Sequence, residues 1–280
     1  MNKRYRFFKH LKITPIIIGV FLVLIGFLLI YLNQEPKPSS FIHNEKDIIY
    51  FAHRGYIFDA PENSYSSVEK AYNKGFNGIE IDISSTIDDK LVLFHDKALN
   101  RMLGINGEIN EISFNDLQKH NIIWKRMPTN QKVVELETIF KDFPNMYYYL
   151  DIKNPSYKNI QQLYDLILKY KMQSRVIIAH AKLLPHLLLK LQHPMIANAL
   201  EGFNAGKEKW INYIPKKLRP NFYSSFFYNT SEEQMNFYKE KNLLDKIIVY
   251  DITKDNYDKA INEYGLKHLI IDIKEIKKNK

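Results

Sequence analysis

Four apolar segments of the sequence carry charged side chains or end in them, and together these side chains could act on a phosphate ester. The residues are His53 and Arg54 after "DIIYFA", Glu80 and Asp82 in "GIEIDIS", His95 and Asp96 after "LVLF", and Asp151 and Lys153 in "YYYLDIKN". Carboxylate oxygens suit a hard divalent cation such as Ca²⁺ or Mg²⁺, whereas Arg and Lys suit a phosphate oxyanion. Two histidines that are free of the metal can donate and accept protons near neutral pH.

The spacing within two of these segments places a pair of side chains on one face. Glu80 and Asp82 are two residues apart, as are Asp151 and Lys153, so in a β-strand each pair points to the same side. Two acids on a buried strand would lose hydration and repel each other, and a bound cation removes that cost. Taken singly, the acids could also be solvated on an edge strand, and Asp151 and Lys153 could form a surface salt bridge. Their common position at successive strand ends favours one site.

The segment "PENS", residues 61–64, follows the first pair after a short loop. Glu62 adds a further acid near the predicted site. Asn63 or Ser64 could be only the N-cap of the helix that we predict at 64–74. Each histidine, likewise, could be an ordinary hydrogen-bonded residue, as we expect for most of the nine in the chain.

Alternating apolar runs and helical patterns predict the elements that must position these residues. Strand candidates lie at 48–52, 78–83, 91–94, 146–152, 175–179, 195–200, 246–250 and 268–272, and helix candidates at 64–74, 134–143, 159–170, 231–241 and 255–264. Eight strands alternating with helices over residues 47–280 favour a (β/α)8 TIM barrel, with an open doubly wound sheet as the alternative. The segment "RPNFYSSFF" could be a further strand. No Gly-rich phosphate loop is present in the sequence.

The N-terminus has a different character. Residues 1–12 carry five Lys and Arg and no acid, and residues 13–32 are 20 residues without a charge, which is long enough to span a bilayer. We expect an uncleaved transmembrane anchor with a cytoplasmic N-terminus, a linker at 33–46, and a catalytic domain in the periplasm or outside the cell. A cleaved signal peptide and a buried core helix are the alternatives, but no small-residue cleavage site follows the apolar run.

The overall composition excludes several kinds of protein. Without the five cations of residues 1–12, the net charge of +9 falls to +4, so much of the basic character belongs to that end. The absence of Cys excludes thiolate catalysis and Cys-ligated zinc, and it fits an exported domain. No zinc-finger spacing, basic helix or aromatic RNA platform indicates binding to nucleic acid.

The ordered motifs "HRGYIFDAPENS", "AYNKGFNGIEIDIS" and "LVLFHDKALNRMLGINGEI" resemble those of the glycerophosphodiester phosphodiesterase family over residues 50–117. The resemblance implies a TIM barrel with one divalent cation, Ca²⁺ or Mg²⁺. It implies that His53 and His95 are the catalytic acid and base, and that Arg54 and Lys153 bind the phosphate. It further implies metal ligation by Glu80, Asp82 and Asp151, with Glu62 beside the metal or orienting Arg54 and His53.

The chain departs from the family pattern at several positions. Asp151-x-Lys153 stands where Glu-x-Lys is usual, and "VIIAHAK" and "IIVYDIT" replace the usual Ser-Phe and Trp-Thr. "HLIIDI" keeps the Asp of the last strand but has Ile271 where Thr is usual. These positions shape the alcohol side of the pocket, so the sequence predicts the reaction type more sharply than the substrate. Residues 99–130 are expected to form a cap over the pocket or to cover the barrel.

These observations lead to one functional hypothesis and two alternatives. We expect metal-dependent hydrolysis of a small or polymeric glycerophosphodiester to an alcohol and glycerol 3-phosphate, at the outer face of a membrane. The first alternative is a phospholipase-D-like lyase that forms a cyclic phosphate from a lipid. The second is a barrel that only binds a phosphorylated ligand; every predicted catalytic and metal-binding residue type is present, which argues against it.

Overall fold

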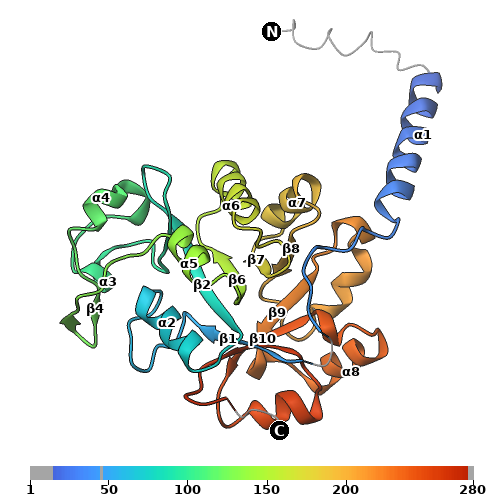
Figure 1. Ribbon diagram of the computed structural model, residues 1–280. Coiled ribbons are helices and arrows are strands. Elements are labelled where there is room, and N and C mark those ends of the chain that lie inside the picture. The colour runs from blue at the N-terminus through green and yellow to red at the C-terminus, as the bar shows by residue number, and fades with distance from the viewer. Residues whose placement is uncertain (1–14, 45–46, 277–280) are drawn as a thin grey trace, which may run out of the picture.

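The computed structural model describes residues 15–44 and 47–276. The predicted cytoplasmic flank at 1–12 and the first two residues of the predicted span at 13–32 therefore lie outside the described residues. The first described element, α1 (Pro15–Leu32), extends away from the rest of the molecule (Figure 1). Within the two described ranges, no helix is both long enough and apolar enough to cross a membrane.

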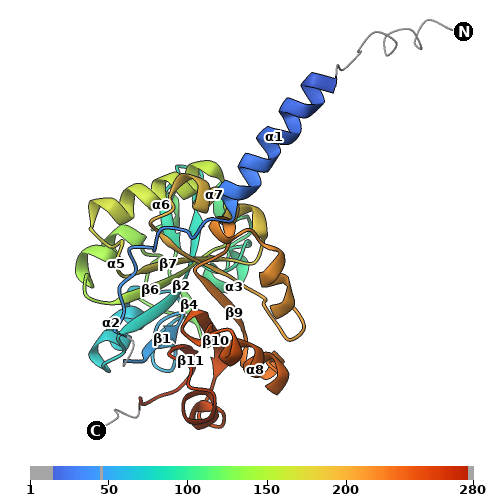
Figure 2. The same cartoon turned by 90° about the vertical axis from the view of Figure 1, so that its right-hand side faces the viewer.

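Eight parallel strands close into a barrel (Figure 2). In order around the barrel they are β1 (Ile49–His53), β2 (Gly78–Ser85), β6 (Tyr147–Ile152), β7 (Val176–His180), β8 (Ala197–Leu200), β9 (Phe222–Phe226), β10 (Ile247–Ile252) and β11 (His268–Ile271). The barrel closes because β1 pairs with β11 as well as with β2. The predicted TIM barrel is confirmed, and the open sheet is excluded.

One predicted barrel strand was wrong. The strand at 91–94 is β3 (Leu91–Leu93), which pairs antiparallel with the outer end of β2 rather than joining the barrel. Only five residues, 86–90, separate β2 from β3, and a parallel pair needs a crossover of about a dozen residues or more. The strand that completes the eight of the barrel is instead β9, which lies in "RPNFYSSFF". Asp151 therefore lies in the third barrel strand, β6, not a fourth, and Lys153 directly follows it.

Helices and short turns surround the barrel. The longer helices are α2 (Tyr65–Asn73), α5 (Leu136–Asp142), α6 (Tyr157–Lys169), α7 (Leu183–Gln192) and α8 (Glu232–Glu240). The helix predicted at 255–264 is a short π-helix over Lys259–Glu263. Between β3 and α5 lie α3 (Asn100–Leu103), α4 (Phe114–Leu117) and the hairpin of β4 (Ile123–Trp124) and β5 (Met127–Pro128). This segment has its own small core, which includes Leu99, Ile109 and Leu117.

Toward the N-terminal ends of its strands, the barrel is filled by apolar side chains on alternate strand positions. Ile49, Phe51 and Tyr149 belong to this interior cluster, and a larger cluster lies between the strands and the surrounding helices. The N-terminal end of the barrel is covered by Phe41, whose ring contacts those of Tyr147 and Phe222. The segment that we expected to be a linker therefore crosses the barrel at the end opposite to the carboxyl ends of the strands, where the predicted site lies.

Gly78 is required by the packing of the barrel interior. A Cβ at this position would lie 2.8 Å from Cδ1 of Phe51 and 3.0 Å from Cγ2 of Ile49, closer than nonbonded carbons approach. We expect Gly78→Ala to lower the free energy of unfolding by about 1–3 kcal/mol, because an added methyl overpacks a filled core. Urea denaturation measures this change. A double variant with Phe51→Leu should recover part of the loss, and an unchanged midpoint in the single variant would contradict the packing argument.

Candidate active site

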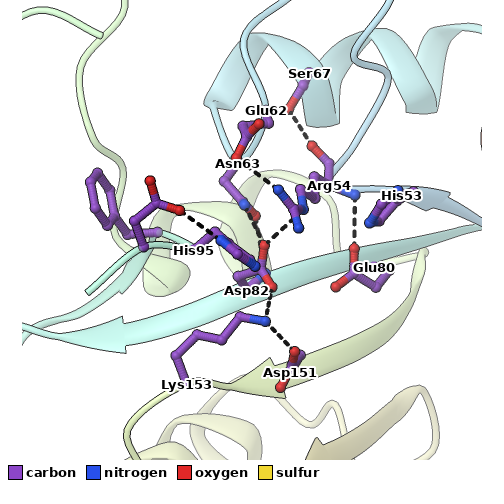
Figure 3. A network of polar contacts seen from close by, with 12 residues as sticks. His53, Arg54, Glu62, Asn63, Ser67, Glu80, Asp82, His95, Asp151 and Lys153 are labelled. Atoms are coloured by element: carbon purple, nitrogen blue, oxygen red, sulfur yellow. Dashed lines mark hydrogen bonds and ion pairs between the residues drawn. The ribbon is translucent and has the colours of Figure 1, made fainter. Parts of the chain in front are cut away.

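The three predicted metal ligands meet at the carboxyl ends of β2 and β6. Carboxylate oxygens of Glu80, Asp82 and Asp151 lie within 4.8 Å of one another. Figure 3 shows all three, with the ammonium of Lys153 between Asp82 and Asp151. The convergence follows from strand register, because Asp82 and Asp151 are direct partners in the β2–β6 ladder and Glu80 lies two residues before Asp82 on the same face.

Two cations lie against these carboxylates. The ammonium of Lys153 is 2.6 Å from Oδ1 of Asp82 and also contacts Asp151. The guanidinium of Arg54 lies 3.3 Å from Oδ2 of Asp82, and the backbone N–H of Arg54 donates to Glu80 over 2.8 Å. Burial alone would raise the pKa of Asp82, but the charges of Lys153 and Arg54 outweigh burial and lower it. Asp82 therefore stays ionised in a nearly water-free position.

The structure separates the roles of Asn63 and Ser64. Ser64 caps α2, since its hydroxyl accepts from the backbone N–H of Ser67. Asn63 instead faces the site: its side-chain amide donates to Oδ2 of Asp82 over 2.7 Å, and its side-chain carbonyl accepts from the Asp82 backbone N–H over 3.0 Å. Asn63 has a positive φ of 51°, a conformation that Asn tolerates better than most residues. Asn63 thus positions Asp82, a role that its interpretation as a possible N-cap did not predict.

His53 is held by a carboxylate from the other end of the domain. Its Nδ1 lies 3.0 Å from Oδ2 and 3.2 Å from Oδ1 of Asp272, which directly follows β11. Burial lowers the pKa of His53, but the hydrogen bond with Asp272 and the negative charge of Glu80 outweigh it and raise the pKa to about 9. Because Nδ1 is bound to Asp272, Nε2 is the nitrogen left for a substrate.

We expect Asp272→Asn to lower the pKa of His53 from about 9 toward the ordinary value of 6.5, because it removes the neighbouring charge. The raised pKa of His53 contributes stability that is fully present below pH 6.5 and is lost as the pH rises through about 9. The variant lacks this contribution, so it should be less stable than the parent protein mainly toward the acidic end of this range. NMR titration of His53 in the metal-free protein measures the shift. An unchanged His53 titration would contradict the pairing.

His95 is held in the same way by its neighbour. Its Nδ1 lies 2.7 Å from Oδ1 of Asp96, and Arg101 contacts Asp96 through Nε at 2.5 Å and Nη2 at 2.9 Å. Arg101 also donates to Glu62, which in turn accepts from Nη1 of Arg54 over 3.0 Å. A continuous chain of hydrogen bonds and ion pairs therefore links His95 to Arg54. Glu62, whose role the sequence left open, contacts Arg54 and Arg101 rather than His53.

The mouth of the barrel holds a cavity of about 260 Å³. It is lined by predicted residues and by others that sequence reasoning missed, namely Tyr149, Glu201, Phe226, Tyr250, Asp251 and Ile270. Tyr149 donates to Oε1 of Glu201 over 2.9 Å, so this acid is fixed beside Asp151. Among the described residues that line the cavity, none comes from 99–130; that segment meets the site through Arg101. Phe226 and Tyr250 add aromatic side chains to the lining of this cavity.

The donor set of the cavity fits one divalent cation. Five acids line the cavity, Glu80, Asp82, Asp151, Glu201 and Asp251, against two side chains with permanent positive charge, Arg54 and Lys153. Burial and the charge of Asp82 raise the pKa of Glu80 to about 7, and burial and the charge of Asp151 raise the pKa of Glu201 to about 8. A hard cation with two charges would balance this excess, and oxygen ligands are those it prefers.

A barrel with this mouth is typical of hydrolases that cleave phosphate esters. The chain belongs to the glycerophosphoryl diester phosphodiesterase family, whose family model matches residues 53–194. A glycerophosphodiester phosphodiesterase of Bacillus altitudinis is 28% identical over 156 residues, covering 50% of this chain and 64% of that protein. A probable glycerophosphodiester phosphodiesterase of Mycobacterium tuberculosis is 30% identical over 131 residues, covering 46% of this chain and 47% of that protein. The matches thus span only part of each relative.

Solved structures share the fold over most of its length. A putative glycerophosphodiester phosphodiesterase from Galdieria sulphuraria has a TM-score of 0.67 at 20% identity, covering 80% of this chain and 94% of that one. A phosphodiesterase from Oleispira antarctica, solved with the product sn-glycerol-3-phosphate, has a TM-score of 0.69 at 19% identity, covering 79% of this chain and 91% of that one. Both similarities confirm the barrel.

Proposed function

We propose that this chain hydrolyses glycerophosphodiesters to an alcohol and glycerol 3-phosphate. The observation that carries the proposal is the convergence of Glu80, Asp82 and Asp151 within 4.8 Å at a barrel mouth that also presents Arg54 and Lys153. Family membership supports the reaction type, and the Oleispira neighbour supports glycerol 3-phosphate as the product. The three carboxylates would hold one Ca²⁺ or Mg²⁺, which when bound supplies positive charge to the phosphate oxygens.

The protein's own groups account for the proton transfers. Arg54 and Lys153 are placed to bind the non-bridging oxygens of the phosphate, where negative charge accumulates during the reaction. One histidine takes a proton from the attacking water as its oxygen bonds to phosphorus. The other donates a proton to the alcohol oxygen as the phosphorus–oxygen bond to it breaks. The Nδ1 contacts to Asp272 and Asp96 orient the two imidazoles for these tasks.

Metal removal and product analysis test the proposal. We expect the full chain with Ca²⁺ or Mg²⁺ to release glycerol 3-phosphate from glycerophosphocholine or glycerophosphoglycerol, as followed by phosphorus NMR. Treatment with EDTA should abolish turnover, and added metal should restore it, because the carboxylates alone repel an anionic substrate. A cyclic phosphate as the final product would favour the lyase alternative, and metal-dependent binding without turnover would favour a binding protein.

We further propose that residues 13–32 hold the domain at a membrane, with residues 1–12 in the cytoplasm and the catalytic domain outside. The support is the run of 20 uncharged residues and its basic flank. Resistance of the full chain to alkaline carbonate extraction, together with protease access to the domain in spheroplasts, tests both parts. Release by carbonate would contradict the anchor, and protease protection would contradict the orientation.

A further inference from the structure

Helix α7 has two leucines turned outward. Leu184 and Leu191 are seven residues apart, hence on one face, and their side chains are 65% and 66% exposed. Two polar residues of the same helix face inward instead: His186 and Lys190 are buried, with His186 Nε2 2.6 Å from the carbonyl of His180 and Lys190 donating to Asn221 over 2.7 Å. A surface helix ordinarily places leucine inside and lysine outside.

The connection between β8 and β9 carries two further exposed apolar side chains. Trp210 and Tyr213, on the 3₁₀ helix at Glu208–Tyr213, are 63% and 79% exposed, with ring centroids 5.9 Å apart. We call Leu184, Leu191, Trp210 and Tyr213 the apolar flank. In both Figures 1 and 2, α7 and the β8–β9 connection lie at the side of the barrel where α1 ends, at Leu32. Exposed apolar surface of this kind marks a contact with a membrane or a partner.

Charge around the apolar flank indicates what it contacts. Residues 181–230 contain only two acids, Glu201 in the catalytic cavity and Glu208, which is 3% exposed. Apart from the buried Lys190, the same residues contain six cations that are exposed or partly exposed: Lys182, Lys207, Lys209, Lys216, Lys217 and Arg219. One of them, Lys216, forms an ion pair with Glu35 of the segment that follows α1. Basic side chains around exposed Trp, Tyr and Leu are typical of surfaces that lie on anionic lipid.

The C-terminal end of α1 lies next to the same surface. A groove between α1 and the barrel is lined by Tyr31, Leu191 and Lys217, and the Lys217 ammonium lies 3.4 Å from the centroid of the Tyr31 ring. The α1 side chains that the structure describes are largely apolar and exposed, including Phe21 and Phe27. Leu191 of the apolar flank therefore lies next to the end of a helix whose described apolar side chains are also exposed.

We propose that the apolar flank is a membrane-docking face that binds the surface of a bilayer containing anionic lipid. Leu184, Leu191, Trp210 and Tyr213 enter the boundary between headgroups and acyl chains, and the surrounding lysines contact lipid phosphates. This docking needs no span by α1 and is separate from the catalytic cavity. It fixes the orientation of the barrel on the membrane rather than the reaction that the barrel performs.

The fluorescence of Trp210 tests the docking face. The chain has two tryptophans, so the full chain with Trp124→Phe reports Trp210 alone, and the full chain with Trp210→Phe reports Trp124 in the β4–β5 hairpin. Both are mixed with vesicles of phosphatidylcholine, with and without phosphatidylglycerol, that carry bromine on the acyl chains. We expect Trp210 emission to shift to the blue and fall at least about twofold on anionic vesicles, since docked aromatic residues lie about 5–10 Å into the interface. Trp124 should be unaffected.

A charge variant tests the lipid preference. Lys209→Gln should lower the ratio of docked to undocked chains on anionic vesicles about fivefold, the effect of one cation near a charged surface. Lys141→Gln on α5 is the matched control and should change nothing. Unquenched Trp210 on all vesicles, or equal quenching of Trp124, would overturn the proposal. A blue shift of Trp210 that grows with protein concentration without lipid would also overturn it, in favour of an interface between copies of this chain.

Discussion

Glu80→Gln is expected to reduce kcat/KM for glycerophosphocholine by at least about 1000-fold, or about 4 kcal/mol of transition-state stabilisation. The substitution keeps the shape of the side chain and an oxygen that can accept from the backbone N–H of Arg54, but it removes one of the three charges that converge within 4.8 Å. Calorimetric titration should show a matching loss of affinity for Ca²⁺ or Mg²⁺.

Stability measurements separate this effect from misfolding. Without metal, Glu80→Gln should unfold at no lower temperature than the parent protein, because it removes one of three mutually repelling carboxylates. Added metal should raise the Tm of the parent protein but not that of the variant. Glu137→Gln, which removes a partly exposed acid that pairs with Lys169, is the matched control and should keep full activity. A fully active Glu80→Gln would refute the assigned cation site.

His53→Ala and His95→Ala are each expected to lower kcat by about 100- to 10 000-fold, the usual contribution of a positioned acid or base. The two variants should differ on a substrate whose leaving group needs no proton, such as a nitrophenyl phosphodiester. The variant that lacks the acid should recover most of its rate there, whereas the variant that lacks the base should stay slow. This comparison assigns the two roles.

His120→Ala serves as the control for these substitutions, because His120 takes no part in the contacts that hold His53 and His95. It should retain full activity on both substrates. If His53→Ala and His95→Ala both retained high activity, the proposed proton transfers would be wrong even if metal dependence held.

Local features of the site were predictable from the sequence. The i, i+2 spacing of Glu80 and Asp82, and of Asp151 and Lys153, determines which side chains share a face once a strand forms. Motif order around "HRGYIFDAPENS" indicated the family, and alternating strand and helix patterns indicated the barrel. These signals extend over a few residues at a time, so they can be recognised without any knowledge of tertiary contacts.

The errors and omissions have a common cause. β3 was placed in the barrel because its composition resembles a buried strand, although its five-residue connection to β2 permits only antiparallel pairing. Asn63 was taken for a possible cap because its contact with Asp82 crosses 19 residues of sequence. Glu201 went unnoticed because no motif surrounds it, and only its contact with Tyr149 fixes it in the cavity.

By itself, the sequence determined the strand and helix alternation, the family, and the residue types that the chemistry needs. Only the tertiary structure decided which of them meet. The contact between His53 and Asp272 joins residues 219 positions apart, and it exists because β11 pairs with β1 to close the barrel. The exposure of Leu184 and Leu191 on α7 could likewise not be predicted from the sequence, since a helical pattern shows that an apolar face exists but not which way it turns. Closure and packing are properties of the whole chain, and no local pattern contains them.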